Sequence, residues 1–304
     1  MQIYRERKKG ILKNTSLALG VFDGVHVGHQ MVIRDAIQKA EVLNLIPAVV
    51  TFSQHPRLVI SGSAPQIITS MEEKLRIFKE LGIENTIILD FTEELAKMPA
   101  EQYLREVLQE CFGAKSISVG YNHRFGSDRK SAGDFLKTYC NENNINLSII
   151  PPVKIDHHTV SSSVIRGFIS SGDVASATVF LGRPFKLSGE VIEGQHIGRQ
   201  LGFPTANLKL DNALILPLRG VYSGVARVKQ GEYKAVISVG RRPTVGEFEN
   251  DLVEVHILDF NEDIYGETLD VLFIDRLREE RKFGSLDELR EQIKADCLSV
   301  MQLK

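Results

Sequence analysis

Two histidines lie close together near the start of the chain, among glycines. The segment Gly20–His29 spans ten residues, and the residues in it that could serve a ligand site are Gly20, Asp23, Gly24, His26, Gly28 and His29. Imidazole nitrogens can donate hydrogen bonds to phosphate oxygens as charge builds up in a transition state. Glycines allow sharp turns close to a ligand. The pattern indicates a nucleotide phosphate site, and the alternative is that both histidines are ordinary surface or core residues.

A second glycine-rich segment, residues 194–207, ends in Pro204-Thr205-Ala206-Asn207. Backbone amides in such a loop can surround phosphate groups. The threonine hydroxyl and the asparagine carbonyl are hard oxygen ligands, which suit Mg²⁺ held partly by phosphate and water. From composition alone, a glycine-rich β-turn is the alternative interpretation.

Glu254 is the third candidate, and it lies in an alternating segment at 252–258. The apolar residues Val253, Val255 and Ile257 share one face, which leaves Glu254 on the opposite face of a strand. A positioned carboxylate can accept the proton of an alcohol during phosphoryl transfer. The alternative is a solvated glutamate on a strand.

Strand-like and helix-like patterns alternate through the first half of the chain. Strands are predicted at 17–21, 46–52, 86–89, 117–119 and 147–150, and helices from Val32 onward, at 71–81, 99–113 and 134–141. This alternation predicts an α/β domain with a parallel, doubly wound sheet covered on both faces. Ligands bind such sheets at the carboxyl ends of the strands, where Gly20–His29 leaves the first strand and opens a helix.

The second half of the chain changes to short strands. After two short helices at 164–169 and 174–181, strands follow from Leu187 onward and include 221–228, 233–239, 252–258 and 269–274. A helix closes the chain after Ser285, where a capping box begins, as another does at Ser70. Many short strands with glycine-rich turns predict a small antiparallel β-barrel. We therefore expect two domains, at 1–183 and 184–304.

Length and composition exclude several classes of protein. The chain has 304 residues, which suits two domains, and a net charge of −2, which gives no bulk attraction to nucleic acid. Its three cysteines are few and far apart, so a disulfide framework is not expected. No apolar run reaches the roughly 18 residues of a membrane span, and the basic start lacks a signal peptide's apolar stretch. We expect a cytoplasmic protein without nucleic-acid or membrane partners, and the sequence does not predict self-association.

The histidine segment is neither a Walker motif nor a dinucleotide fingerprint. It resembles the HxGH motif of the nucleotidylyltransferase superfamily, and its longer form at 22–26 resembles the bacterial bifunctional riboflavin kinase/FAD synthetase family. Further segments resemble motifs of that family, in the family's order, at 51–56, 119–126, 161–166, 194–207, 220–222, 240–245, 253–260 and 277–283.

The resemblance implies roles for residues of the first domain. His26 and His29 would stabilise the triphosphate during adenylyl transfer. The residues implied to bind ATP and its phosphates are Gly20, Phe22, Asp23, Gly24, Gly28, Ser162, Ser163 and Arg166. The residues implied for the flavin and nucleotide pocket are His55, Asn122 and Arg124. From the residues alone, the serines at 161–163 could be only a helix cap, and His55 could simply end a strand.

For the second domain, the resemblance implies a riboflavin-kinase barrel with a C-terminal helix. Its ATP-binding residues would be Gly194, Gly198, Arg199, Gly202 and Pro204. Thr205 and Asn207 would hold Mg²⁺, and Glu254 would act as the catalytic base. A further hypothesis is that the loops at 198–201 and 241–248 close over the substrate.

The expected function is therefore two sequential reactions. ATP phosphorylates riboflavin to FMN, and ATP then adenylylates FMN to FAD with release of pyrophosphate. Riboflavin, FMN and ATP would be the small-molecule partners, with Mg²⁺ as cofactor. Two rivals remain open: an enzyme with only one of the activities, and a flavin- or nucleotide-binding regulator without turnover.

Overall fold

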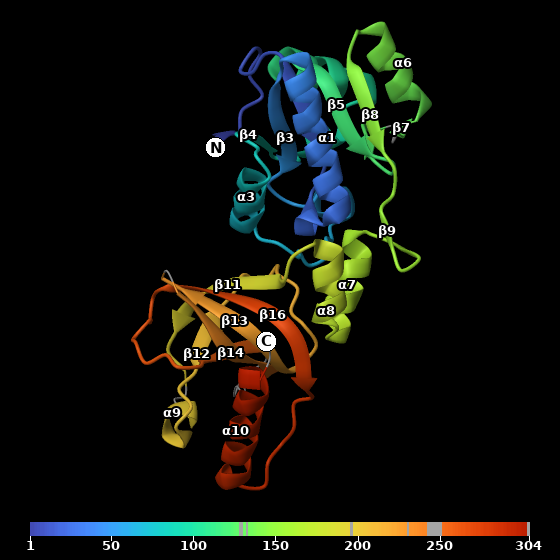
Figure 1. The fold of residues 1–304 in the computed structure, drawn as a ribbon. Coiled ribbons are helices and arrows are strands. Elements are labelled where there is room, and N and C mark those ends of the chain that lie inside the picture. Colours follow the sequence, from blue (N-terminus) through green and yellow to red (C-terminus); the bar gives the residue numbers. More distant parts are fainter. Residues whose placement is uncertain (128–129, 132, 195–196, 230, 242–250, 303–304) are drawn as a thin grey trace. The chain divides into compact units, whose positions relative to one another are not determined.

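The structure is a computed structural model that describes residues 1–127, 130–131, 133–194, 197–229, 231–241 and 251–302 (Figure 1). The chain divides into two compact units, Met1–Ser162 and Ser163–Lys304.

The first unit is built on a six-stranded sheet. Its strands are β1 (Gln2–Tyr4), β2 (Thr15–Leu19), β3 (Ile46–Phe52), β4 (Asn85–Leu89), β5 (Ala114–Gly120) and β8 (Asn146–Ile150). Their order is β1-β4-β3-β2-β5-β8, and every neighbouring pair is parallel. The predicted parallel sheet is confirmed. From β2 the chain extends the sheet in one direction through β3 and β4, and then crosses over to β5 on the other side of β2.

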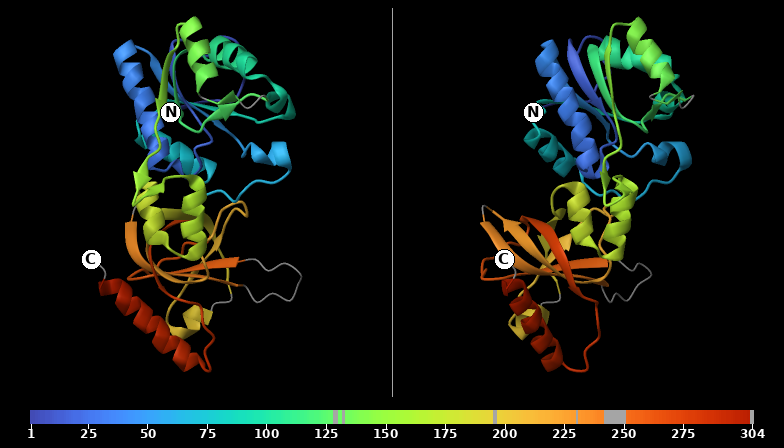
Figure 2. Two further views of the ribbon diagram at one scale, coloured as in Figure 1. Left: turned by 90° about the vertical axis from the view of Figure 1, so that its right-hand side faces the viewer. Right: turned by 45° about the vertical axis from the view of Figure 1, so that its right-hand side comes forward.

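Helices cover both faces of this sheet (Figure 2). Helices α1 (Val27–Leu43) and α3 (Met71–Glu80) share one buried core with Ala18 and Val49. The π-helix η2 (Tyr103–Cys111) and α6 (Asp134–Glu142) share another core with Leu17 and Val50. Successive residues of a strand point to opposite faces, so this division confirms the doubly wound arrangement.

The structure differs from the prediction in several elements of the first unit. The short edge strand β1 was missed, because it has three residues and Ile3 in it is 44% exposed. The first predicted strand ends at Leu19 rather than Val21, whose carbonyl accepts side-chain hydrogen bonds instead of continuing the strand. The predicted helix after Pro99 is a turn, α5 (Ala100–Gln102), followed by η2. The unpredicted elements are α2 (Arg57–Ser61), α4 (Glu93–Lys97) and the hairpin pairs β6 (Arg124–Phe125) with β7 (Lys130–Ser131) and β9 (Lys154–Ile155) with β10 (His158–Thr159).

The second unit is a closed antiparallel barrel with helices, as predicted. Its strands are β11 (Phe185–Ile192), β12 (Ala206–Lys209), β13 (Gly220–Val228), β14 (Gly231–Arg241), β15 (Asp251–Ile257) and β16 (Thr268–Arg278), in the order β11-β12-β15-β14-β13-β16. Its helices are α7 (Ser162–Ser171), whose first residue belongs to the first unit, α8 (Val174–Leu181), α9 (Ile197–Leu201) and α10 (Leu286–Gln302).

The two predicted capping boxes mark real helix starts. The Ser70 hydroxyl accepts a hydrogen bond from the Glu73 amide at 3.2 Å, and the Ser285 hydroxyl accepts one from the Glu288 amide at 3.2 Å. Each cap satisfies an amide that the helix itself leaves free. The first cap fixes where α3 begins, and α3 carries a residue that matters for the site below.

The C-terminal helix is attached to the barrel by a buried ion pair. Arg278 at the end of β16 donates from Nε and Nη2 to Asp296 of α10, at 3.0 and 2.7 Å. The Asp296 side chain is 6% exposed and that of Arg278 is 20% exposed. Gln292 donates to the same carboxylate at 2.9 Å.

We expect Asp296→Ala to destabilise the barrel unit by about 3 kcal/mol, because it leaves a largely buried guanidinium without its carboxylate. Urea unfolding of the full-length protein checks this, with Glu291→Ala, an exposed position on the same helix, as the matched control. Equal stability of the two variants would contradict the expectation.

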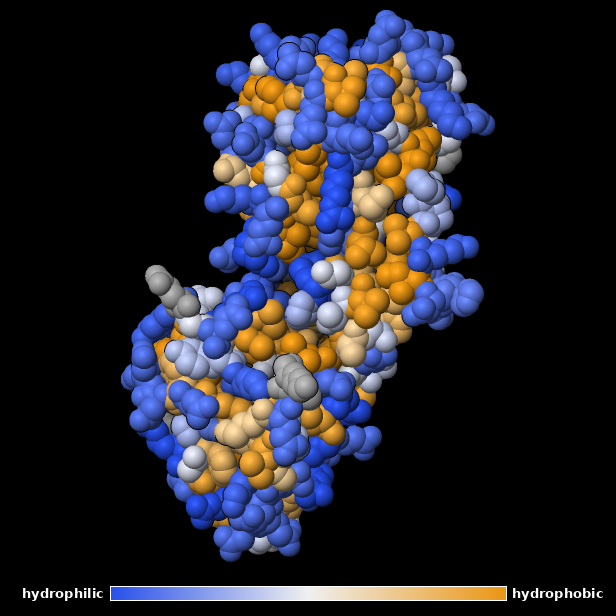
Figure 3. Space-filling model, viewed as in Figure 1, coloured by the Kyte–Doolittle hydropathy of each residue, from blue (hydrophilic) through white to orange (hydrophobic). Residues whose placement is uncertain are grey.

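Hydrophilic residues cover much of the surface of both units on the face shown in Figure 3. Within the described ranges, the helices are too short or too polar to cross a membrane.

Candidate functional site

The segment Gly20–His29, called the histidine loop below, leaves the carboxyl end of β2. Strand β2 lies between β3 and β5, so the loop sits where the chain order reverses. That reversal is the switch point at which open α/β sheets bind ligands. The loop runs through a short 3₁₀ turn, η1 (Asp23–Val25), and into the N-terminus of α1. The predicted strand-to-helix position of the two histidines is confirmed.

His26 and His29 lie directly against one another. Their rings are stacked with centroids 3.5 Å apart. The Nδ1 atom of His26 accepts the His29 backbone N–H at 3.2 Å, so His26 caps α1. His26 is only 6% exposed and His29 is half-buried. The two imidazoles lie together at a helix N-terminus, a position that favours an anion.

The backbone of the histidine loop is unusual. Phe22 has φ 53° and Val25 has φ 39°, both in the left-handed region that side chains disfavour. Gly24, at φ 81°, adopts that region without cost. Strain of this kind persists only where surrounding contacts enforce it.

Several hydrogen bonds enforce the loop conformation. The Val21 carbonyl accepts from Thr51 Oγ1 at 3.0 Å and from Lys74 Nζ at 2.9 Å. The buried Asp23 carboxylate accepts the backbone amides of residues 68 and 69, at 2.9 and 3.3 Å. The Asp23 carbonyl accepts the Ser162 hydroxyl at 2.9 Å. Ser162, predicted as an ATP residue, is therefore brought to the loop.

The other predicted residues of this site follow neighbouring strands. His55 lies just past β3, where its Nδ1 accepts the Arg57 amide at 3.2 Å. Asn122 and Arg124 are exposed and follow β5. Because β2, β3 and β5 are parallel neighbours, these segments leave the same edge of the sheet.

Ser163 and Arg166 lie on α7, in the part of that helix that belongs to the second unit. Ser163 is exposed and Arg166 is half-buried. Of the three predicted ATP residues on this helix, Ser162 belongs to the first unit and donates to the histidine loop.

Two ionisable groups near this sheet edge have shifted pKa values. Burial lowers the pKa of Lys74 to about 8, and the nearby Asp23 carboxylate partly opposes the shift. Desolvation lowers the pKa of His123, in the segment after β5, to about 4. The His123 imidazole is therefore uncharged at neutral pH.

The barrel places Glu254 and Asn207 side by side. They are paired residues of the antiparallel strands β15 and β12, so their side chains share one face. Val253 and Val255, on the other face of β15, are fully buried. The predicted alternation is confirmed, and Glu254 points away from the barrel interior.

The glycine-rich segment before β12 presses closely on the predicted metal ligands. A Cβ atom at Gly194 would lie 2.1 Å from Asn207 Nδ2, and one at Gly198 would lie 3.3 Å from Thr205 Oγ1. Asn207 is 4% exposed, and its Oδ1 atom accepts no hydrogen bond within the described part of the chain. A buried oxygen without a donor suits a cation.

The remaining residues predicted for the barrel site surround the same segment. Gly198 and Arg199 lie in α9, Gly202 follows it, and the Pro204 carbonyl lies 2.7 Å from His256 Nδ1. Part of the 240–245 motif and most of the loop predicted at 241–248 fall at 242–250, outside the described residues.

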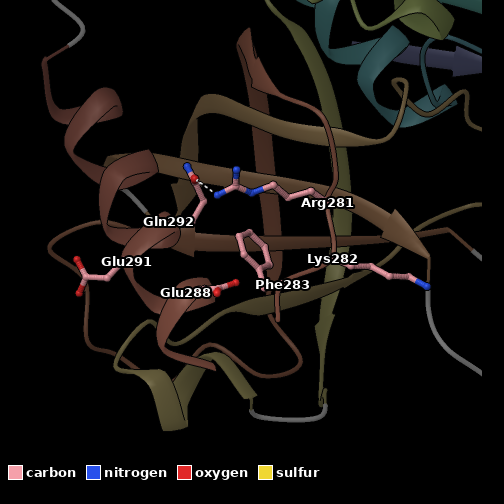
Figure 4. A pocket seen from close by; sticks show the side chains of 6 residues that line it. All are labelled: Arg281, Lys282, Phe283, Glu288, Glu291 and Gln292. Carbon is pink, nitrogen blue, oxygen red and sulfur yellow. Dashed lines mark hydrogen bonds between the residues drawn. The ribbon is translucent and has the colours of Figure 1, made fainter. Parts of the chain in front are cut away.

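A pocket of about 500 Å³ lies beside α10 (Figure 4). It is lined by Arg281, Lys282, Phe283, Glu288, Glu291 and Gln292. The Arg281 guanidinium lies 4.7 Å from the centre of the Phe283 ring and donates to Gln292. The lining is mostly charged, unlike the apolar walls typical of a pocket for a small organic molecule.

Sequence reasoning missed Thr51 and Lys74, whose side chains donate to the Val21 carbonyl of the histidine loop. A signal for Lys74 was present: it lies three and four residues before Ile77 and Phe78, on the buried face of α3. Thr51 lay within a motif at 51–56 that was noted for other reasons.

Comparisons with known proteins agree with the two-unit structure. A family model described as FAD synthetase matches residues 8–164, and one described as riboflavin kinase matches residues 181–304. The chain is 34% identical over 288 residues to the bifunctional riboflavin kinase/FMN adenylyltransferase of Haemophilus influenzae, covering 94% of this chain and 93% of that protein. It is 35% identical over 286 residues to the protein of the same description from Bacillus subtilis, covering 92% and 89%.

A solved structure is also similar over the full length. It is a crystal structure described as a macrolide-efflux protein from Streptococcus pneumoniae, with a TM-score of 0.92 and 35% identity, covering 100% of this chain and 99% of that one. The two proteins share their fold and part of their sequence, and the activity named in that description is said of the Streptococcus protein alone.

Proposed function

Since the chain belongs to the bifunctional riboflavin kinase/FMN adenylyltransferase family, we propose that it makes FMN from riboflavin and FAD from FMN, with each reaction in its own unit. Both reactions consume ATP. The observation that carries the proposal is the pair of sites: stacked histidines at the switch point of one unit, and Glu254 beside Asn207 in the other. The predicted domain boundary at 183/184 is also a proposal, since the compact units divide at 162/163.

In the first unit, the phosphate of FMN attacks the α-phosphorus of ATP and pyrophosphate leaves. No protein nucleophile is needed, so the site acts by alignment and by stabilising negative charge. We assign His26, His29 and the amides at the start of α1 to the triphosphate. Ser162, whose hydroxyl donates to the Asp23 carbonyl, would bind other ATP phosphate oxygens, and the phosphate-binding roles implied for Ser163 and Arg166 stay predictions. The stacking of the two rings and the cap that His26 forms on α1 support this, because they hold the imidazole groups in place before the reaction.

The glycines of the histidine loop would let the backbone approach ATP. Phe22 and Asp23 are 1% and 4% exposed, and the Asp23 carboxylate already accepts two backbone amides. We therefore propose that these two residues act on ATP binding by shaping the loop. His55, Asn122 and Arg124 would line the flavin and nucleotide pocket, since their segments leave the same sheet edge.

In the barrel, Glu254 would accept the proton of the ribityl hydroxyl as its oxygen attacks the γ-phosphorus of ATP. The loop that carries Gly194, Gly198, Arg199, Gly202 and Pro204 would hold ATP. Most of the rate enhancement in phosphoryl transfer comes from positioning and charge neutralisation. The position of Glu254 beside Asn207 supports its role, because it places the base next to the predicted phosphate and metal ligands.

Thr205 and Asn207 fit a magnesium ion. The buried Oδ1 atom of Asn207 and the Thr205 hydroxyl are hard oxygen donors on one short segment. Two protein oxygens leave most of the coordination of Mg²⁺ open, so substrate phosphate and water would complete it. Bound Mg²⁺ would neutralise phosphate charge. The residues' own part is to hold their oxygens in place.

We expect Gly194→Ala to lower the rate of FMN formation by roughly tenfold or more, because a Cβ atom 2.1 Å from Asn207 Nδ2 must displace that amide. Conversion of FMN to FAD should stay unchanged. Steady-state assays of each step check this, with Gly167→Ala as the control, because that position in the same unit is open to a Cβ atom and has no positive φ. Normal FMN formation in Gly194→Ala would show that Asn207 is not part of the site.

Incubation with riboflavin, ATP and Mg²⁺, followed by chromatography of the flavins, tests the proposed function as a whole. We expect FMN to appear first and FAD to follow. FMN without FAD would support the kinase-only alternative, and neither product would support a regulator without turnover.

The cellular setting is part of the same proposal. All three cysteines are unpaired and buried, which is consistent with the expected cytoplasmic location. The absence of nucleic-acid and membrane partners stays a prediction, and self-association is not part of the proposal.

A further inference from the structure

We propose that Lys74 is a positioning residue for adenylyl transfer, because its ammonium group holds the carbonyl that sets the conformation of the histidine loop. The inference rests on the site proposed above for His26 and His29. It assigns a role to a side chain that lies outside every motif noted in the sequence.

The contact is at the first bend of the loop. Lys74 lies on α3, is 6% exposed, and donates from Nζ to the Val21 carbonyl at 2.9 Å. Thr51 Oγ1 donates to the same oxygen at 3.0 Å. Two donors therefore fix the peptide plane between Val21 and Phe22. Phe22 is the first residue of the histidine loop with positive φ, so this plane determines how the chain enters the strained turn of the loop.

The fixed turn leads to His29 through one aromatic contact. The Phe22 ring meets the His29 ring edge-on, with centroids 5.3 Å apart, and meets Phe78 in the same way at 5.7 Å. Phe78 lies one helical turn after Lys74 on α3. Helix α3 thus holds both the backbone before Phe22 and the ring of Phe22, while His29 stacks on His26. A shift of the Val21 carbonyl would move the histidine pair.

A lysine is a costly residue at this position. Burial lowers the pKa of Lys74 to about 8, and the Asp23 carboxylate in η1 is the charge that opposes the shift. On α3 itself, the neighbouring Glu73 is paired with Arg76. An apolar side chain would fill the space with less desolvation. We therefore attribute the role of Lys74 to its charged donor, which binds the Val21 carbonyl.

Lys74→Met tests the inference, since methionine keeps an unbranched side chain but removes the donor and charge. We expect kcat for conversion of FMN to FAD to fall by roughly 10- to 100-fold, because small misplacements of reacting geometry are that costly. The KM values for FMN and ATP should change by less than about threefold, since the histidine donors act mainly on the charge that builds up in the transition state. FMN formation from riboflavin should be unchanged. Lys79→Met, an exposed lysine on the same helix, is the matched control.

A spectroscopic measurement separates positioning from general loss of structure. The ring protons of His26 and His29 should shift in the NMR spectrum of Lys74→Met, because stacked rings at 3.5 Å shield one another. Resonances of the barrel unit should stay in place. Lys74→Arg, which keeps a charged donor, should recover part of the lost kcat.

Three results would overturn the inference or its premise. Normal kcat and KM values in Lys74→Met would show that Lys74 does not position the histidine pair. If His29→Ala in the same assay keeps full adenylyl transfer, the proposed site itself is wrong. If Lys74→Met does not fold, Thr51→Val removes the other donor to the same carbonyl. It should then lower kcat without raising KM, and an unchanged kcat would reject the inference.

Discussion

Glu254→Gln lowers the rate of FMN formation by roughly 10²- to 10⁴-fold in our expectation, the range that a general base contributes. Glutamine has the same shape but cannot accept the hydroxyl proton. Glu254 points away from two fully buried valines and lies beside Asn207 on the neighbouring strand, so the substitution changes the site and not the barrel core. Conversion of added FMN to FAD should continue at the wild-type rate, because it occurs in the other unit.

The measurement is a pair of separate assays, one supplied with riboflavin and one with FMN. Glu190→Gln is the matched control, since Glu190 is a largely exposed glutamate on β11 of the same barrel. The role of Glu254 as base would be rejected by FMN formation within about tenfold of wild type. Loss of both steps in a folded variant would reject the assignment of the two reactions to separate sites.

The positions of Glu254 and His26 could be predicted from the sequence, because a clear periodic pattern surrounds each of these candidate site residues. Val253 and Val255 alternate with Glu254, and alternation on a strand has one structural meaning, so the facing of Glu254 followed directly. The placement of His26 after β2 followed equally well, because a parallel sheet brings strand ends to one edge.

The parts that could not be predicted are those decided by contacts far apart in the chain. Nothing local reveals that the Val21 carbonyl leaves the strand to accept from Thr51 and Lys74, which lie 30 and 53 residues away. The same holds for the Asp23 carboxylate, which looks like a phosphate-site residue in sequence but accepts amides 45 and 46 residues further on. A local motif identifies the residue types of a site, whereas tertiary contacts decide which of them face the ligand.

The edge strand β1 shows a different limit. It pairs with β4 through three residues, too few for an alternating pattern to stand out. Its basic, exposed surroundings are also typical of a chain terminus. Its extended structure is decided by backbone pairing with the neighbouring strand β4.

His29→Ala should have the opposite effect to Glu254→Gln, lowering conversion of FMN to FAD by roughly 10²- to 10³-fold, the cost of removing one donor that stabilises transition-state charge. FMN formation should continue, so the variant should accumulate FMN from riboflavin. Part of the loss would come through His26, because its ring is stacked on His29 at 3.5 Å. Phe22 would also lose a ring contact, but the Val21 carbonyl keeps both of its donors.

The control for His29→Ala is His158→Ala, an exposed histidine in β10 of the same unit. His29→Gln is informative as well, since glutamine keeps an N–H donor and should retain more adenylyl transfer than alanine. If alanine and glutamine are equally inactive while KM values stay normal, the position of the ring matters more than its donor. That result would shift the charge-stabilising role to His26 and the amides of α1. Full adenylyl transfer in His29→Ala would show that the stacked histidine pair is a structural cap and that the triphosphate is held elsewhere.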